Sequence, residues 1–184
     1  TSIALGSFDG LHSGHRRVIK GIKRNGPEIA TVVSFWPHPR EILYGEPRLR
    51  LDLPSEKAHL LEPLGIKQLV LVPFNRELAS LSAETFINKV LIETLDARQI
   101  SIGENFKFGK DREGDALTLT RIADKKGVDV TIVPILKDDY GRVSSSRIRS
   151  ALNAGDINNA EALLGRPYNF RGVVVKGKGL GKKI

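Results

Sequence analysis

Two histidines separated by a serine and a glycine are the residues of this sequence best suited to chemistry. His12 and His15 lie in LGSFDGLHSGHR, residues 5–16, directly after an apolar segment over residues 2–5 that predicts a buried strand. Glycines at a strand end allow a tight turn and a close approach to a ligand. Apolar residues after His15 recur at helical spacing, which puts the pair at a helix N-terminus, where free N–H groups and the macrodipole favour an anion. The pattern predicts a phosphate-binding loop in which both imidazoles donate hydrogen bonds, with Gly14 leaving room between them.

Other kinds of site fit this loop less well. A single histidine near a helix start is usually a surface residue, but a pair with a glycine between its members is harder to explain in that way. A metal site would need a third ligand, and Asp9 precedes His12 too closely to be oriented toward it. The glycines Gly6, Gly10 and Gly14 are four residues apart, so the loop is not a GxGxxG dinucleotide motif. It is not a P-loop either, because no Gly-Lys-Ser or Gly-Lys-Thr follows.

The composition limits the class of protein. The chain has 184 residues, 40% of them hydrophobic, which is enough for one good core. Cysteine is absent, which excludes a disulfide framework, thiolate zinc and thiol catalysis and agrees with a reducing cytoplasm, the expected location. Because no apolar run approaches the length of a membrane span and no signal peptide opens the sequence, no membrane association is expected. The sequence lacks methionine and begins within a strand, so we expect residues to be missing at both ends.

The net charge is +8, from 29 basic and 21 acidic residues. Such a charge attracts polyanions, either nucleic acid or phosphorylated small molecules. Six of the basic residues and no acidic residue lie within residues 162–184. Aromatic residues are too sparse to alternate with the basic ones as base-stacking platforms. Small-molecule phosphates are therefore the expected partners, and a nucleic-acid-binding module is the less favoured alternative.

The rest of the sequence alternates between apolar strands and helices. Strands are expected over residues 2–5, 28–35, 68–72, 99–103 and 128–133. Helices are expected to follow His15, Asp52, Ser82, Asp115, Ser146 and Asp156. Continuously apolar strands that alternate with helices indicate an α/β fold, a Rossmann-like five-stranded parallel sheet with helices on both faces. Ligands bind beyond the carboxyl ends of such strands, where the histidine loop, the proline-rich WPHP loop at residues 36–39 and the loop at residues 104–114 converge.

A second helix N-terminus carries three serines and two arginines. One of the hydroxyls of Ser144, Ser145 and Ser146 is needed only to cap the helix. The other two, with Arg147 and Arg149, remain for phosphate oxygens, which the planar guanidinium group binds in a bidentate manner.

These two motifs carry a family resemblance. GSFDGLHSGH resembles the HxGH signature of the nucleotidyltransferase superfamily, whose members transfer a nucleoside monophosphate from a triphosphate and release pyrophosphate. SSSRIR resembles the second signature of that superfamily, Ser-Ser-Thr-x-x-Arg, and Ser146 in place of threonine keeps the hydroxyl. The two motifs alone also fit cytidylyltransferases and pantetheine-phosphate adenylyltransferases. Three further stretches, SFWPHP, GENFKFGKDREGD and GRPYNFRGVVVKGKGLGKKI, resemble the prokaryotic bifunctional FAD synthetases, in which an FMN adenylyltransferase domain precedes a riboflavin kinase barrel.

The resemblance implies a reaction and roles for individual residues. FMN and ATP would give FAD and pyrophosphate with Mg²⁺, an ion held mostly by phosphates and water, so its protein ligands are left unassigned. The implied catalytic residues are His12, His15, Ser145, Ser146 and Arg149. Those implied to bind ATP are Gly6, Phe8, Asp9, Gly14 and Ser144, and those implied to bind FMN are His38, Asn105, Phe106 and Phe108, of which Phe106 and Phe108 are equally well explained as core anchors.

The resemblance also implies two parts of the chain. Residues 1–165 would form the adenylyltransferase domain, and residues 166–184 a linker with the incomplete start of the kinase barrel, whose first strand is expected over residues 170–175. The sequence ends before the Gly-Phe-Pro-Thr-Ala-Asn motif of the kinase step. Kinase activity is therefore expected of the full-length protein and not of these residues.

Overall fold

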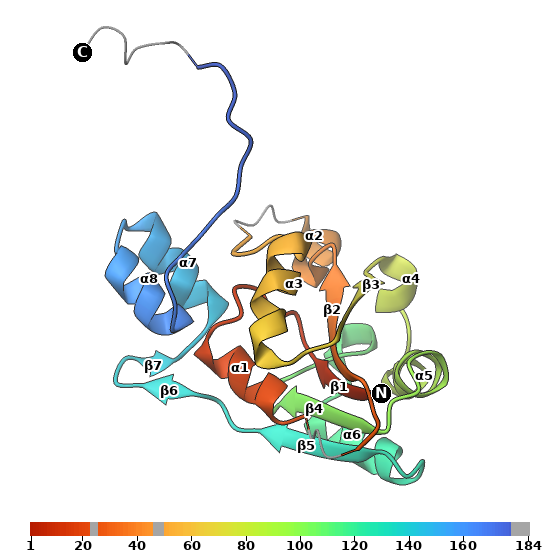
Figure 1. Ribbon diagram of the computed structural model, residues 1–184. Helices are drawn as coiled ribbons and strands as arrows, with labels where there is room; N and C mark the ends of the chain where they lie inside the picture. Colours follow the sequence, from red (N-terminus) through yellow and green to blue (C-terminus); the bar gives the residue numbers. More distant parts are fainter. Residues whose placement is uncertain (23–25, 46–49, 178–184) are drawn as a thin grey trace, which may run out of the picture.

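A five-stranded parallel sheet forms the centre of the molecule (Figure 1). The computed structural model describes residues 1–22, 26–45 and 50–177. The strands lie in the order β3-β2-β1-β4-β5. They comprise β1 (Ser2–Leu5), β2 (Ala30–Trp36), β3 (Gln68–Pro73), β4 (Gln99–Gly103) and β5 (Asp129–Val133). The predicted α/β fold is confirmed, with the strand that leads into the histidine loop at the middle of the sheet.

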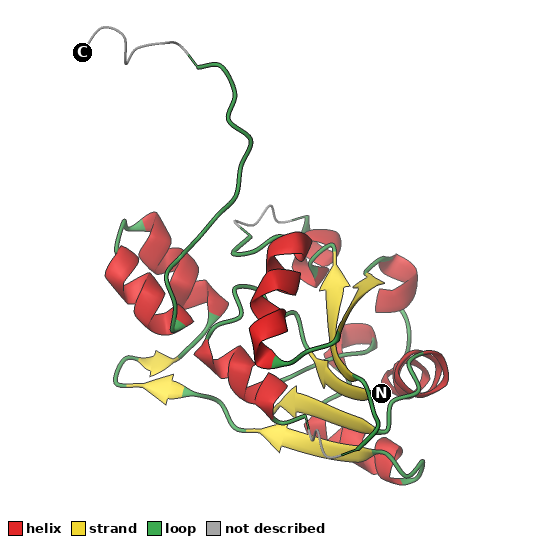
Figure 2. Cartoon of the chain, in the orientation of Figure 1, coloured by secondary structure: helices red, strands yellow, loops and turns green. Residues whose placement is uncertain are grey.

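Helices cover both faces of this sheet (Figure 2). One face carries α1 (Ser13–Lys20) and α3 (Pro54–Leu61), and the other carries α5 (Ala83–Thr85), the π-helix η2 (Phe86–Thr94) and α6 (Ala116–Asp124). Side chains of a strand alternate between faces. Ile3 and Leu5 of β1 therefore pack with η2 and α6, whereas Ala4 packs with α1 and α3. These two cores fix the direction in which β1 delivers the loop that follows it.

Helices α7 (Ser145–Asn153) and α8 (Ile157–Leu164) form a separate pair beside the sheet (Figure 1). They have a small core of their own, which includes Ile148, Leu163 and, from a distant part of the chain, Leu51. A short hairpin, β6 (Lys137–Asp138) and β7 (Gly141–Arg142), joins β5 to α7. The second serine-rich helix terminus is therefore carried by a body that has its own core and is not part of the sheet layers.

Several predicted elements differ in the structure. The WPHP stretch was predicted as a loop, but α2 (Pro39–Tyr44) starts at its second proline, a residue whose fixed φ suits the first helical position. The helix expected after Asp52 is α3, which starts at Pro54 with Leu53 at the N-cap position. That helix continues through the short 3₁₀-helix η1 (Glu62–Leu64), and two short elements were not predicted, α4 (Arg76–Ala79) and η3 (Lys110–Arg112).

The chain after α8 leaves the body as an extended segment (Figure 1). No strand forms over residues 170–175, and the side chains of Phe170 and Val174 are 80% and 98% exposed. An apolar strand without a partner strand cannot bury a face. The strand implied here belongs to a kinase barrel, so it stays a prediction for the full-length protein. The expected loop at residues 176–183 extends beyond the described residues. Across residues 1–22, 26–45 and 50–177, none of the helices is both long enough and apolar enough to cross a bilayer.

Candidate active site

The loop after β1 has an unusual backbone. Phe8, Gly10 and Leu11 have φ angles of +46°, +85° and +45°, and the side chains of Phe8 and Leu11 are each only 1% exposed. A residue other than glycine adopts a positive φ only where its surroundings hold it there. The loop is therefore defined by its contacts with the rest of the protein.

A buried ion pair provides part of that support. The carboxylate of Asp52 accepts a hydrogen bond from the Gly10 amide at 2.9 Å and lies 2.7 Å from the ammonium of Lys57. The same ammonium donates to the carbonyl of Phe8 at 2.5 Å. Burial, the largest influence, raises the pKa of Asp52, and Lys57 opposes this rise. A charged pair placed inside the protein thus fixes two peptide groups of the loop.

The two histidines stack on each other at the start of α1. Their ring centroids are 3.6 Å apart and their planes are 18° from parallel. Nδ1 of His12 accepts a hydrogen bond from the His15 amide at 3.2 Å and so caps the helix. A neutral imidazole that accepts at Nδ1 carries its proton on Nε2, so His12 keeps one donor for a ligand. A Cβ on Gly14 would lie 3.1 Å from Cε1 of His12, which explains the glycine between the histidines.

Both imidazoles are neutral at pH 7. Burial lowers the pKa of His12 to about 4, with a further contribution from the positive charge of Arg142 and an opposing one from Asp9. The pKa of His15 also lies well below its usual value because of burial and then of His12 and Lys57. Nδ1 of His15 is buried and has no hydrogen-bond partner among the described residues. An unpartnered polar atom beside a cavity is a candidate contact for a ligand.

The second helix terminus is joined directly to the histidine loop. Ser145 donates from its hydroxyl to the carbonyl of Asp9 at 2.8 Å, and the guanidinium of Arg149 forms an ion pair with the carboxylate of Asp9. The other carboxylate oxygen of Asp9 accepts from the amide of Leu51 at 3.1 Å. Ser144 is the N-cap and accepts from the amide of Arg147 at 3.3 Å. Asp9 therefore links the two motifs, a function that the sequence did not predict.

These contacts separate the three serines by what they do in this structure. All three serines line the cavity described next. The hydroxyl proton of Ser145 is engaged in the bond to Asp9, whereas the oxygen of Ser144 only accepts its capping bond and keeps its proton to donate. The first amides of α7 have no intrahelical acceptor, as at any helix start. Phosphate donors at this terminus are therefore best sought in Ser144, Ser146, these amides and the neighbouring arginines.

A single cavity of about 740 Å³ collects the predicted site residues. Such a volume is within the range of roughly 300–1,000 Å³ that is usual for small-molecule sites. The candidates assigned to catalysis, to ATP and to FMN all line it: Gly6, Phe8, Asp9, His12, Gly14, His15, His38, Asn105, Phe106, Phe108, Ser144, Ser145, Ser146 and Arg149. Arg147, which was also expected to bind phosphate, does not line the cavity, because its guanidinium pairs with Asp138 at 2.8 Å and donates to the carbonyls of Gly141 and Arg142. The convergence of three loops at the carboxyl edge of the sheet is thus observed.

One wall of the cavity is aromatic. Phe106 and Phe108 lie with ring centroids 5.7 Å apart and planes 20° from parallel, and Phe86 is 5.7 Å from Phe108. Phe108 belongs to the core, and Phe106 packs against it. The two rings are therefore core anchors that also face the cavity. His38 lies at the cavity as the N-cap of α2, where its Nδ1 accepts from the amide of Arg40 at 3.2 Å.

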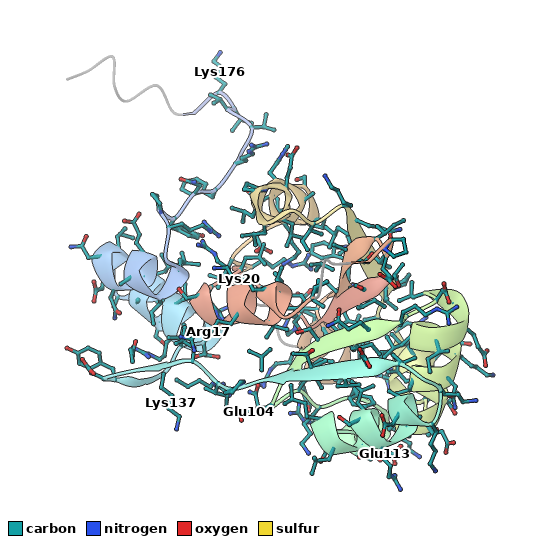
Figure 3. The ribbon with its side chains drawn as sticks, turned by 60° about the horizontal axis from the view of Figure 1, so that its bottom comes forward. Arg17, Lys20, Glu104, Glu113, Lys137 and Lys176 are labelled. Carbon is teal, nitrogen blue, oxygen red and sulfur yellow. The ribbon has the colours of Figure 1, made fainter. Side chains whose placement is uncertain are left out.

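Sequence reasoning missed several residues of the cavity. Arg142 lines it next to His12, and Lys107, Phe35 and Phe74 line it at or beyond the ends of strands. Arg142 could have been predicted from its position two residues before the serines, because a cation next to a phosphate-binding motif strengthens the binding of phosphate there. Not every basic residue of the region takes part. Arg17 and Lys20 lie on the exposed face of α1 (Figure 3) and do not line the cavity.

Known proteins resemble this chain along its whole length. A family model described as FAD synthetase matches residues 1–147. A bifunctional riboflavin kinase/FMN adenylyltransferase of Escherichia coli (strain K12) is 35% identical over 99% of this chain and 59% of its own length. The protein of the same name from Bacillus subtilis (strain 168) is 36% identical over 99% of this chain and 58% of its own length. This chain therefore spans about three fifths of the length of these relatives.

A solved structure agrees with these matches. A crystal structure described as a macrolide-efflux protein from Streptococcus pneumoniae superposes with a TM-score of 0.84 and 32% sequence identity. The superposition covers 99% of this chain and 60% of that one. Together with the family match over most of the chain and the joined HxGH and SSSRIR motifs in one cavity, this likeness leads to one conclusion: the chain belongs to the FAD synthetase family.

Proposed function

We propose that this chain is an FMN adenylyltransferase, which transfers AMP from ATP to FMN. The observation that carries the proposal is the single cavity in which two helix N-termini, two stacked neutral histidines and several arginines meet an aromatic wall. The helix N-termini, the histidines and the arginines suit a triphosphate, and the aromatic wall suits a flat ring system. The names of the relatives and the family description support the same reaction.

The reaction needs no nucleophilic side chain. A phosphate oxygen of FMN attacks the α-phosphorus of ATP in line, the bond from that phosphorus to the bridging oxygen breaks, and pyrophosphate leaves with the electron pair. Catalysis then depends on alignment of the two substrates and on stabilisation of the charge that develops on the phosphates. Nε2 of His12 and the buried nitrogen of His15 would donate to those oxygens. Because both imidazoles start neutral, they can bind the triphosphate as hydrogen-bond donors without the cost of an unpaired buried charge.

The second motif would hold the outer phosphates. Ser146 and the first amides of α7 offer donors, and Arg142 adds a positive charge close to His12. Arg149 is oriented by its ion pair with Asp9. We therefore propose that Arg149 and Asp9 keep the two phosphate-binding ends at a fixed separation, while Gly6, Phe8 and Gly14 shape the adenosine side through the backbone.

FMN would occupy the aromatic side of the cavity. Phe106 offers a partly buried ring above Phe108, and offset stacking on such rings stabilises a planar heterocycle. His38 and Asn105 lie at the same cavity and would contact the polar groups of FMN.

Mg²⁺ would enter with the phosphates of ATP. In the part of the chain that the structure describes, no three His, Cys, Asp or Glu side chains lie together as a metal site would need. The carboxylate of Asp9 is engaged by Arg149 and Leu51. This donor set does not fit a protein cage for the ion, which is commonly held by one or two carboxylates, substrate phosphates and water. We therefore assign no protein ligand to Mg²⁺.

Incubation with FMN, ATP and Mg²⁺, followed by chromatography of the flavins, tests the function. We expect FAD from FMN and no FMN from riboflavin in a parallel reaction. Release of pyrophosphate only with another acceptor would keep a nucleotidyltransferase and remove the flavin assignment. Neither FAD nor pyrophosphate under any of these conditions would contradict the proposal.

The division of the chain is part of the same proposal. Residues 1–165 would be the adenylyltransferase, and residues 166–184 a linker and the start of the kinase domain that the names of the relatives include. A chain ending at Asn169 lacks the exposed apolar segment that follows, and we expect it to fold and to make FAD at the rate of the 184-residue chain. Loss of FAD formation by that shorter chain would show that the tail belongs to the active domain.

A further inference from the structure

The segment that follows α8 is bonded to the back of the histidine loop. Gly165 ends α8 with φ at +65°, and a Cβ there would lie 2.9 Å from the hydroxyl oxygen of Ser13. The carbonyl of Gly165 accepts from Nη1 of Arg16 at 3.3 Å, and Nη2 of Arg166 donates to the carbonyl of Gly10 at 3.1 Å. Each arginine thus donates a hydrogen bond to a carbonyl of the opposite segment: Arg16 to the segment after α8, and Arg166 to the histidine loop.

The bond from Arg166 means that both backbone polar groups of Gly10 are hydrogen-bonded to distant side chains. The amide of Gly10 donates to the buried Asp52, and its carbonyl accepts from Arg166. The next carbonyl, that of Leu11, accepts from Nε of Arg16 at 3.3 Å. Gly10 and Leu11 both have positive φ and directly precede His12. Since such a backbone is kept only by its surroundings, the groups that hold these carbonyls also set where the His12 imidazole lies.

The shape of the guanidinium group matters here. Nη1 of Arg166 donates to the carbonyl of Pro167 at 3.0 Å while Nη2 reaches Gly10. A planar fork can bond two carbonyls on different segments at once, whereas a lysine ammonium on a flexible stem fixes neither direction. Arg166 is partly buried, beside a core to which it contributes no side chain. Its loss should therefore free the loop and leave the core of α7 and α8 intact.

We propose that Arg166 is a positioning residue for the adenylyl transfer: it holds the Gly10 carbonyl, and through it His12, from the segment that follows α8. Its kinetic consequence rests on the proposed function. The residue lies beyond residues 1–147 that the family model matches, so the catalytic loop depends on a part of the chain outside that model. A displacement of Arg166 would therefore move the Gly10 carbonyl, and with it His12 at the phosphate site.

Three variants of the 184-residue chain test this proposal. Arg166→Ala removes both bonds, Arg166→Lys keeps the charge without the fork, and Arg171→Ala is the matched control because its exposed side chain lies five residues further along the same segment. We expect Arg166→Ala to lower kcat by about 10-fold or more, the scale expected when reacting groups are misaligned, with the KM for FMN changed less than about 2-fold and the thermal midpoint close to that of the control. Arg166→Lys should recover only a small part of the loss.

A second measurement separates positioning from simple stability and from the reaction itself. Imidazole nitrogen resonances of His12, followed against pH by NMR without any substrate, should shift in Arg166→Ala toward those of a solvated ring, with a pKa above the value of about 4 in the parent chain. The spectrum of Arg171→Ala should match the parent. If Arg166→Ala and Arg171→Ala have the same spectra, the proposal is overturned, whatever the activity. If the parent chain makes no FAD, the proposed function fails, and the spectra alone decide whether Arg166 positions the loop.

Discussion

His15 is the residue whose chemistry is least explained by the fold alone. Its ring stacks on His12 and meets the Phe8 ring edge-on with centroids 5.4 Å apart, yet its buried Nδ1 has no partner in the described residues. We expect His15→Ala to lower the rate of FAD formation by about 100-fold, the scale of a lost transition-state donor. The loss should appear in kcat, because the donor acts on charge that develops during the reaction.

His59 provides the control for this substitution. It lies exposed on α3, so His59→Ala removes an imidazole without touching the cavity and should leave the rate unchanged. Steady-state kinetics and circular dichroism on both variants are sufficient. FAD formation by a folded His15→Ala at nearly the parental rate would remove His15 from the catalytic residues.

His12 makes stability depend on pH with a defined sign. Its pKa is about 4 in the folded chain, below the usual value for an exposed histidine. From about pH 6.5 downward the unfolded chain takes up a proton that the folded chain refuses, so the free energy of unfolding falls until about pH 4 and the stability is fully present only above pH 6.5. Linkage puts the loss from this residue at about 3 kcal/mol between pH 7 and pH 4.

His12→Asn isolates this contribution, because asparagine is also a good N-cap but does not titrate. Urea unfolding at pH 7 and at pH 4 should show a smaller pH-dependent loss in the variant than in the parent chain, with the carboxylates common to both cancelling in the comparison. Equal losses in the two proteins would mean that the His12 imidazole is protonated as easily in the folded chain as in water.

At the scale of elements, α3 supports the active-site loop through a charge. Lys57 is only 6% exposed and bonds both Asp52 and the carbonyl of Phe8. Lys57→Met should destabilise the protein by about 3 kcal/mol, because it leaves a buried carboxylate unpaired. Asp52→Asn combined with Lys57→Met should recover part of that loss.

Lys20→Met is the comparison for this pair, since Lys20 is exposed on α1 (Figure 3). It should change the free energy of unfolding by less than about 0.5 kcal/mol. Denaturant titrations of the three variants measure these differences. A Lys57→Met protein as stable as Lys20→Met would show that the buried pair adds nothing to the loop.

Helix starts and strands that are determined by residues adjacent in the sequence could be predicted from the sequence alone. Ser82, Asp115 and Asp156 cap their helices as expected, through bonds to amides three residues away. The five strands follow from continuous apolar runs. Pro39 was misjudged because proline disfavours a helix everywhere except at the first turn. The sequence alone does not show which of these two situations holds.

Contacts between distant segments were not predictable. Asp52 lies two residues before the proline that starts α3, but its carboxylate binds Gly10 and Lys57 from another part of the chain. Asp9 could be placed in the loop but not paired with Arg149, 140 residues away. Local pattern gives the type of each residue at the site, whereas the tertiary fold decides which hydroxyl or carboxylate is engaged by protein and which is left for a ligand.

At the scale of the whole molecule, the site lies between two bodies with separate cores. The sheet and its helices carry the histidine loop, and α7 with α8 carries the serines on a small core of its own (Figure 1). Asp9, bonded to Ser145 and Arg149, and the hydrogen bonds from Arg16 and Arg166 join the two bodies on either side of the loop. A triphosphate that contacts both helix termini would add a further link between them.

That arrangement predicts a particular pattern of protection on binding. Hydrogen–deuterium exchange with and without ATP and Mg²⁺ should show slower exchange at residues 12–16 and at residues 144–148 together, because one ligand orders both helix termini. The amides of β1 and β4, already in the middle of the sheet, should change little and serve as the internal reference. FMN alone should protect residues 105–108 and leave residues 144–148 as they were. Protection by ATP at only one of the two termini would mean that the bodies do not share the triphosphate, and the phosphate-binding role of the serine-rich terminus would have to be withdrawn.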